Sequence, residues 1–204
     1  MRLACSINEI EDEREAGPEF NGGKMKKKLS EMSLEELWKM FPIYLTEYQP
    51  SWKEWYADEE NLLRNRVPKI GRISHIGSTA IHSICAKPII DIAVAVHDIK
   101  DILPYIEVLK QHNIFFHEGA VAGEVFFVME DGDIRTHHIH IVKRNGTGWS
   151  NYISFRDYLN ANPEKAMMYD EFKRKSAVRF ADDRKRYTAS KQEIIGQLLS
   201  EANM

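Results

Sequence analysis

The sequence predicts a mixed α+β fold, in which a mixed β-sheet flanked by helices is followed by a helical C-terminal third. Two observations carry this prediction. Strand-like apolar runs alternate with helical patterns between residues 43 and 148. From residue 149 onward, apolar residues recur at helical spacing only. We therefore expect a single domain over 25–204, with an α/β core at about 43–148 and a helical part at about 149–204.

The first expected elements precede the sheet core. A capping-box pattern that begins at Ser33 predicts a short helix at 33–41, which Pro42 ends. Residues 43–47 are typical of a short strand. Aromatic and leucine residues at helical spacing then predict a helix at 51–66.

The middle of the chain alternates strands and a helix. One strand is expected around 70–75. An apolar run that follows Pro88 predicts a second strand at 88–96. Asp98 is a favourable N-cap for a helix at 99–112.

A hairpin and three helices complete the prediction. Two alternating runs are separated by Asp131-Gly132, a hairpin turn signal. The expected strands lie at 124–130 and 134–143. The expected helices lie at 150–160, at 163–180 with Asn162-Pro163 at its start, and at 188–202 with Thr188 as N-cap.

Composition excludes several classes of protein. A net charge of −3 and a pI of about 6.3 argue against a basic nucleic-acid surface, so no DNA or RNA partner is expected. Cys5 and Cys85 form no CxxC pair, which excludes a zinc ribbon. No apolar run reaches the ~18 residues of a membrane span, so we expect a cytoplasmic protein. Residues 1–24 are interpreted as a mobile leader, with Met25 as an alternative start.

A carboxylate interrupts the most apolar strand. Because strand side chains alternate between faces, Asp91 shares a face with small residues, Ala93 and Ala95, and not with the isoleucines. A lone buried carboxylate is costly unless it is paired or binds a cation. We therefore expect Asp91 to face a cleft.

The turn before this strand is a candidate phosphate site. Gly77, Ser78 and Thr79 supply backbone N–H groups and two hydroxyls, and glycine allows the backbone to approach a ligand closely. The same three residues also occur in ordinary turns, so the motif alone does not decide between the two readings.

Two other segments carry candidate binding residues. His138 and His140 share one face of a strand and could hold a metal ion or an anion, or they could simply be solvated. Arg135 opens that strand as a candidate phosphate clamp. Lys191, near Tyr187 at the start of the last helix, is either a ligand-binding residue or part of an exposed charged face.

Five motifs together resemble the GrpB family, also called UPF0157, over about residues 43–200. Most follow family patterns of the form H-x-G-S-T-A, A-K-P-I-I-D-I, R-T-H-H-x-H and F-R-D-Y-L. The matching residues are His75–Ala80, Ala86–Ile92, Arg135–His140, Phe155–Leu159 and the Tyr187-Thr188-x-x-Lys191 signature.

This family looks like a branch of the DNA polymerase beta-like nucleotidyltransferase superfamily. The resemblance implies a nucleotidyltransferase-like sheet and a Gly77-Ser78 turn that holds the phosphates of a nucleoside triphosphate (NTP). It also implies a divalent metal at Asp91, Mg²⁺ or Mn²⁺. Lys87, Arg135, Tyr187 and Lys191 would bind the nucleotide.

The chain departs from the superfamily pattern at the second carboxylate. Ile89 and Ala93 occupy the positions two residues before and after Asp91. Two-metal phosphoryl transfer needs carboxylates that bridge both ions. His138 and His140 could complete a metal site, and imidazole suits Zn²⁺ or Mn²⁺ better than Mg²⁺.

Three functions therefore remain open. The first is an enzyme that transfers a nucleotidyl group to a small acceptor, with Asp91, His138 and His140 as catalytic residues. The second is a domain that binds a nucleotide or another phosphorylated ligand without turnover. The third is an accessory protein associated with dephospho-CoA kinase, because the resemblance includes fusions to that enzyme.

Overall fold

The computed structural model describes residues 43–68, 70–117, 125–131, 134–181 and 183–204. The predicted leader at 1–24 and the predicted helix at 33–41 lie outside these ranges. Among the described residues, no helix is both long enough and apolar enough to cross a membrane.

The described residues form a five-stranded sheet with the strand order β1-β2-β5-β4-β3. Strands β2 and β5 pair in parallel, and the other neighbouring strands pair antiparallel. The sheet is therefore mixed, as the sequence predicts. The strands are β1 (Arg72–Ile76), β2 (Ile90–Val96), β3 (Ile114–His117), β4 (Val125–Asp131) and β5 (Ile134–Lys143).

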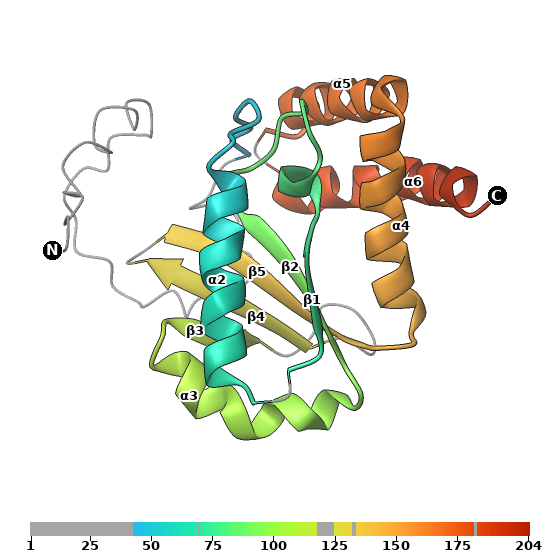
Figure 1. The fold of residues 1–204 in the computed structure, drawn as a ribbon. Coiled ribbons are helices and arrows are strands. Elements are labelled where there is room, and N and C mark those ends of the chain that lie inside the picture. Colours follow the sequence, from blue (N-terminus) through green and yellow to red (C-terminus); the bar gives the residue numbers. More distant parts are fainter. Residues whose placement is uncertain (1–42, 69, 118–124, 132–133, 182) are drawn as a thin grey trace, which may run out of the picture.

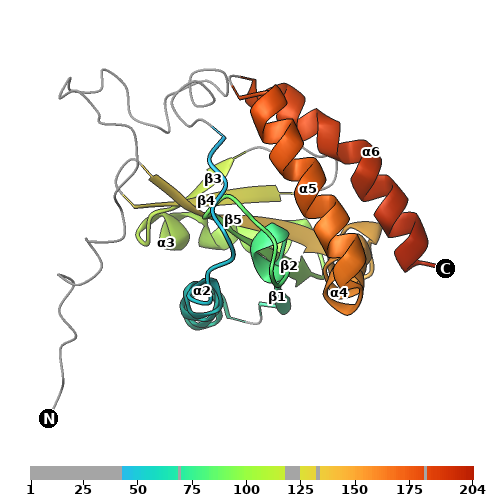
Figure 2. The same cartoon turned by 90° about the horizontal axis from the view of Figure 1, so that it is seen from above.

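Helices surround this sheet (Figures 1 and 2). Helix α2 runs over one face of the sheet, whereas α4, α5 and α6 are grouped at the side formed by β1 and β2. The helical C-terminal third is thus confirmed. The α-helices are α2 (Trp52–Arg66), α3 (Ile106–Lys110), α4 (Thr147–Ala161), α5 (Pro163–Arg179) and α6 (Arg184–Ala202), and the 3₁₀ helices are η4 (Ser78–Ala80) and η5 (Ile99–Tyr105).

Two apolar clusters hold the layers together. The first joins α2 to the isoleucine and valine face of β2 and β5, with Trp52 and Leu63 fully packed in it. The second joins Ile81 and Ile84, which follow η4, to α4, α5 and α6. The segment after η4 is therefore packed against the C-terminal helices.

Two predicted elements differ from the structure, and one strand was not predicted. Residues 43–47 form only one isolated bridge, between Thr46 and Ala86, and not a strand. The predicted helix at 99–112 is a 3₁₀ helix followed by the short α3, since Pro104 cannot donate a helical hydrogen bond. Strand β3 has no counterpart in the prediction.

The last helix begins earlier than predicted. Asp183, and not Thr188, is its N-cap, and the Asp183 side chain accepts a hydrogen bond from the backbone N–H of Arg186. Both residue types are good N-caps, so sequence preference alone does not choose between them. Asp98 caps η5 in a complete capping box, which confirms that predicted cap.

Glu59, on α2, is a buried carboxyl group. It is 3% exposed, and its Oε1 atom has no hydrogen-bond partner among the described residues. Burial raises the pKa of Glu59 to about 7.

Glu59→Gln is therefore expected to raise the free energy of unfolding at pH 8, by up to about 3 kcal/mol. The folded state binds the proton of the Glu59 carboxyl group more tightly than the unfolded state does. The loss in free energy of unfolding that Glu59 causes is therefore absent below about pH 4.5 and complete above about pH 7. Urea unfolding of both proteins should show a stability difference that grows across this window. The exposed Glu54→Gln on the same helix is the control, and a difference independent of pH would contradict the prediction.

Candidate functional site

The candidate phosphate turn lies directly against Asp91. Strand β1 ends at Ile76, which pairs with Asp91 across the antiparallel ladder. The next residue, Gly77, has a φ of +70°. A Cβ atom at Gly77 would lie 2.3 Å from Asp91 Oδ2. Glycine is therefore required here both by the backbone conformation and by the carboxylate next to it.

Asp91 contacts the two predicted histidines on the neighbouring strand. In the parallel pair of β2 and β5, Asp91 lies opposite His138, and Ala93 lies opposite His140. Asp91 Oδ1 is 3.2 Å from His138 Nδ1 and 3.8 Å from His140 Nε2. The Asp91 side chain is 30% exposed, so the cluster is open to solvent on one side.

The histidines keep the Asp91 carboxyl ionised. Burial favours the neutral acid, but the hydrogen bond from His138 and the nearby His140 imidazole outweigh it and hold the pKa of Asp91 well below its usual value of 3.8. Asp91 therefore carries its negative charge throughout the physiological pH range.

Tyr152 of α4 is a further member of the cluster that the sequence patterns did not identify. Its hydroxyl lies 3.3 Å from His140 Nδ1, and the two rings are 5.3 Å apart at their centroids. One imidazole thus contacts Tyr152 through one nitrogen and faces Asp91 with the other. The signal in the sequence is only a tyrosine on an amphipathic helix, which does not reveal this contact.

The predicted metal ligands Asp91, His138 and His140 lie together. In the structure the two histidines contact the carboxylate directly. Among the residues the structure describes, no three His, Cys, Asp or Glu side chains form a ready metal-binding group. Asp91 is the one carboxylate that the described residues bring to this cluster, which does not fit the two-ion Mg²⁺ centre of nucleotidyltransferases. Two imidazoles with one carboxylate are a donor set that suits Zn²⁺ or Mn²⁺.

The two hydroxyls of the turn face different partners. The Ser78 side chain faces the buried Tyr169 of α5. Thr79 is 2% exposed, and its Oγ1 lies 2.9 Å from His75 Nε2. Thr79 therefore supports the turn from inside the protein, and its hydroxyl is not presented beside Asp91.

His75 is a buried, neutral anchor for this turn. Its ring stacks on Tyr56 with centroids 4.9 Å apart. Burial is the main cause that lowers the pKa of His75 to about 4. His137, on the α2 face of β5, is likewise buried, and burial is the main cause that lowers its pKa to about 4.

Two of the predicted phosphate-binding lysines meet at one tyrosine. Lys87 Nζ lies 4.9 Å and Lys191 Nζ 4.7 Å from the centre of the Tyr187 ring. Tyr187 is buried at 1% exposure. Residues about a hundred positions apart thus place two ammonium groups around one aromatic ring, a cation–π arrangement.

Lys173 of α5 links these lysines to the turn, and the sequence patterns did not single it out. Its ammonium group donates to the carbonyl oxygen of Cys85 and lies 5.0 Å from the centre of the Tyr169 ring. Burial is the main cause that lowers the pKa of Lys173 to about 8, and the charge of Lys191 contributes to this shift. The remaining predicted clamp, Arg135, lies in β5, and its side chain is outside the described part.

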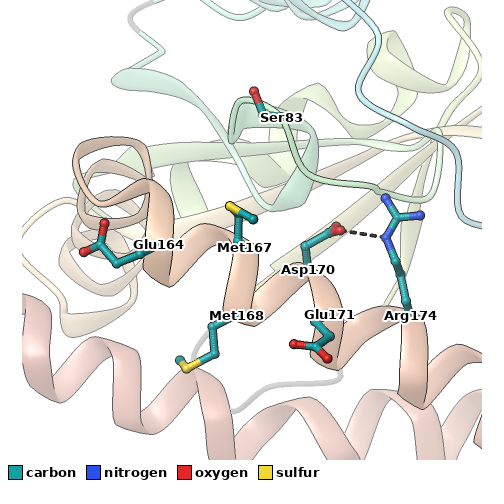
Figure 3. Close-up of a pocket in the computed structure, with 7 residues that line it drawn as sticks. All are labelled: Ser83, Glu164, Met167, Met168, Asp170, Glu171 and Arg174. Atoms are coloured by element: carbon teal, nitrogen blue, oxygen red, sulfur yellow. Dashed lines mark hydrogen bonds and ion pairs between the residues drawn. The ribbon is translucent and has the colours of Figure 1, made fainter.

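A separate hollow is lined by α5 and by Ser83 (Figure 3). Its walls include Met167 and Met168, which are 70% and 43% exposed. Asp170 and Arg174 in its wall are already ion-paired at 2.7 Å. None of the predicted site residues lines this hollow, so we place the candidate site at Asp91 and the turn. The lining residues are Ser83, Glu164, Met167, Met168, Asp170, Glu171 and Arg174.

Known sequences match most of the chain. The family model described as GrpB protein matches residues 42–201. The glutamate-rich protein GrpB of Alkalihalophilus pseudofirmus is 34% identical over 165 residues, which cover 78% of this chain and 95% of that protein. The UPF0157 protein YqkA of Bacillus subtilis is 33% identical over 150 residues, which cover 72% of this chain. The matched part is 43% of YqkA, so the chain spans less than half the length of that relative.

Solved structures give a similar result. The crystal structure of the conserved protein GrpB from Enterococcus faecalis aligns with a TM-score of 0.71 and 28% identity, over 79% of this chain and all of that one. A cytoplasmic RNA terminal U-transferase aligns with a TM-score of only 0.38 and 15% identity, over 68% of this chain and 45% of that one. The second similarity is too distant to support any inference.

Proposed function

The chain belongs to the GrpB family, and on that premise we propose that it binds a nucleoside triphosphate between the Gly77–Thr79 turn and the lysines around Tyr187. One observation carries the proposal. Three segments that are distant in sequence, 77–91, 138–140 and 169–191, meet around the Asp91 carboxylate and Tyr169.

The chemistry of these segments suits a polyphosphate. The backbone at the start of η4 provides hydrogen-bond donors next to Gly77, which lies against Asp91. Lys87 and Lys191 provide positive charge at Tyr187, and Lys173 lies between Tyr169 and Lys191. Phosphate oxygens prefer such charged and backbone donors.

A divalent cation is a second part of the proposal. An ionised carboxylate repels the phosphates of a nucleotide unless a cation lies between them. Asp91, His138 and His140 would hold that cation, Mn²⁺ or Zn²⁺ by donor type and Mg²⁺ by resemblance, and their mutual hydrogen bonds would then be replaced. The cation would neutralise phosphate charge at the turn.

Nucleotidyl transfer to a small acceptor is the second candidate function. The observation that favours it is the contact series from Asp91 through His140 to Tyr152, because an imidazole between a carboxylate and a phenol can accept and donate protons. An association with dephospho-CoA kinase stays a prediction from the family resemblance alone.

Lys87→Ala and Lys191→Ala are each expected to weaken ATP binding about tenfold, because each removes one charge-assisted contact to phosphate. Isothermal titration calorimetry at two salt concentrations measures the affinity. The loss should be greater at low salt, where the charges are less screened.

Lys110→Ala is the matched control, since Lys110 is 58% exposed and lies on α3, outside the site. Unchanged ATP affinity in both site variants would remove the Tyr187 lysines from the proposal. An equal loss in the control would show a general charge effect instead of a site.

A further inference from the structure

Three polar residues of α4 form one stripe that faces the site. Tyr152, Arg156 and Asn160 are four residues apart, so they lie on the same side of the helix. Tyr152 contacts His140, as described above. Arg156 and Asn160 contact the chain on either side of the Gly77–Thr79 turn.

Arg156 holds the end of the strand that leads into the turn. Its Nη1 atom donates to the carbonyl oxygen of His75 at 2.9 Å and to the Ser74 hydroxyl. Its Nε and Nη2 atoms bind the Asp157 carboxylate at 2.8 and 2.7 Å, which orients the guanidinium. The fork of donors on one arginine therefore fixes the chain just before Gly77.

Asn160 holds the chain just after the turn. Its Nδ2 atom donates to the carbonyl oxygen of Ala80 at 3.0 Å. Its Oδ1 atom accepts from the backbone N–H of His82, also at 3.0 Å. A single side-chain amide thus replaces a strand or helix partner for two backbone groups.

The turn has little backbone support of its own. Within η4 the backbone hydrogen bonds are Ala80 N–H to Gly77 and Ile81 N–H to Ser78, both 3.3 Å long. Such long 3₁₀ bonds are weak. Side chains from outside the turn must therefore contribute to its shape.

Helix α4 is a firm support for these contacts. The face next to this stripe carries Phe155, Tyr158 and Leu159, which pack in the apolar cluster with α5 and α6. Ile81 and Ile84 of the turn segment pack in the same cluster. The helix and the turn are thus held to one rigid body, with the polar stripe between them.

We propose that Arg156 and Asn160 are positioning residues that hold the Gly77–Thr79 turn in the shape that binds phosphate. The ligand part of this inference rests on the proposed function. The structural part is independent of the proposed function, because it concerns the local opening of the turn in the ligand-free protein.

Hydrogen–deuterium exchange of the ligand-free protein tests the structural part. In Asn160→Ala and in Arg156→Ala, the backbone amides of residues 78–82 are expected to exchange about tenfold faster than in wild type. The exchange rates of the β2 amides should not change. Arg156→Lys keeps one donor and should lie between Arg156→Ala and wild type. Asn151→Ala, an exposed asparagine on the same helix, is the control and should exchange like wild type.

ATP affinity of the same variants, measured below their melting temperatures, tests the ligand part. A drop of about tenfold in Asn160→Ala but not in Asn151→Ala supports the positioning role. Equal exchange at 78–82 in Asn160→Ala and Asn151→Ala would overturn the proposal, and so would equal ATP affinity. If the wild type binds no ATP, the proposed function fails and the exchange result alone decides the role of the stripe. Because Asn160 is exposed, its variant remains informative if Arg156→Ala does not fold.

Discussion

Gly77→Ala is expected to abolish nucleotide binding and to lower the free energy of unfolding by about 2–6 kcal/mol. Two effects add at this position. An alanine at a φ of +70° and a ψ of −169°, a region adopted almost only by glycine, costs about 1–3 kcal/mol. Its methyl carbon would also lie 2.3 Å from Asp91 Oδ2, so the carboxylate or the turn has to move, which costs about 1–3 kcal/mol.

The movement of Asp91 or of the turn is the reason why ATP binding is expected to be lost. Asp91 cannot shift away from Gly77 without changing its distances to His138 and His140. The turn cannot shift without breaking its contacts to Arg156 and Asn160. Urea unfolding measures the first effect, and calorimetric titration with ATP measures the second.

Gly196→Ala is the matched control for this substitution. Gly196 lies in α6, and a Cβ atom there would meet nothing within 4 Å. Alanine is the better helix former by about 1 kcal/mol, so this variant should be slightly more stable than wild type and bind ATP normally. A Gly77→Ala protein with wild-type stability and affinity would contradict the described contact between the turn and Asp91.

Asp91→Asn is expected to remove nucleotide-dependent stabilisation while the chain still folds. At a ligand concentration of 100 times the dissociation constant, wild type should gain about 2.7 kcal/mol. If the substitution weakens binding about 100-fold, the same concentration gives only about 0.4 kcal/mol. Thermal unfolding with ATP and Mn²⁺ measures both gains, with the exposed Asp58→Asn as control.

The direction in which ATP affinity changes in Asp91→Asn distinguishes a site that uses a cation from one that does not. If a cation joins Asp91 to the phosphates, the loss of the carboxylate weakens ATP binding. If phosphates bind without a cation, the loss of a nearby negative charge strengthens ATP binding. An increase in affinity on this substitution would therefore eliminate the metal from the account.

Asp91→Asn also has a predicted pH dependence without ligand. The pKa of Asp91 is depressed in the folded state, so its charge stabilises the fold above the unfolded-state value of about 3.8, and this stability is lost as the pH falls. The variant should therefore be less stable than wild type at pH 7, and the difference should shrink below about pH 4.

The sheet and the face that carries Asp91 could be predicted from the sequence because strands repeat every two residues. Alternation in 88–96 placed Asp91 on the alanine side, and the structure agrees. The same alternation separated His138 and His140 from His137. Pairing between β2 and β5 is a long-range property, so alternation did not show that Asp91 and His138 lie opposite each other.

Other parts of the site depend on contacts that no local pattern encodes. Lys173 looks like a solvated helix residue in the sequence, yet it is 1% exposed because α5 packs against the segment around Cys85. Arg156 and Asn160 belong to a helix with ordinary amphipathic spacing. Their partners lie about 80 residues away, so only the fold reveals what they hold.

The most direct test of the account is calorimetric titration of wild type and Asp91→Asn with ATP, in Mg²⁺, Mn²⁺, Zn²⁺ or chelator. The account predicts that wild type binds ATP only with a divalent cation and that Asp91→Asn loses this binding. Absence of ATP binding by wild type under every condition would contradict the nucleotide site itself.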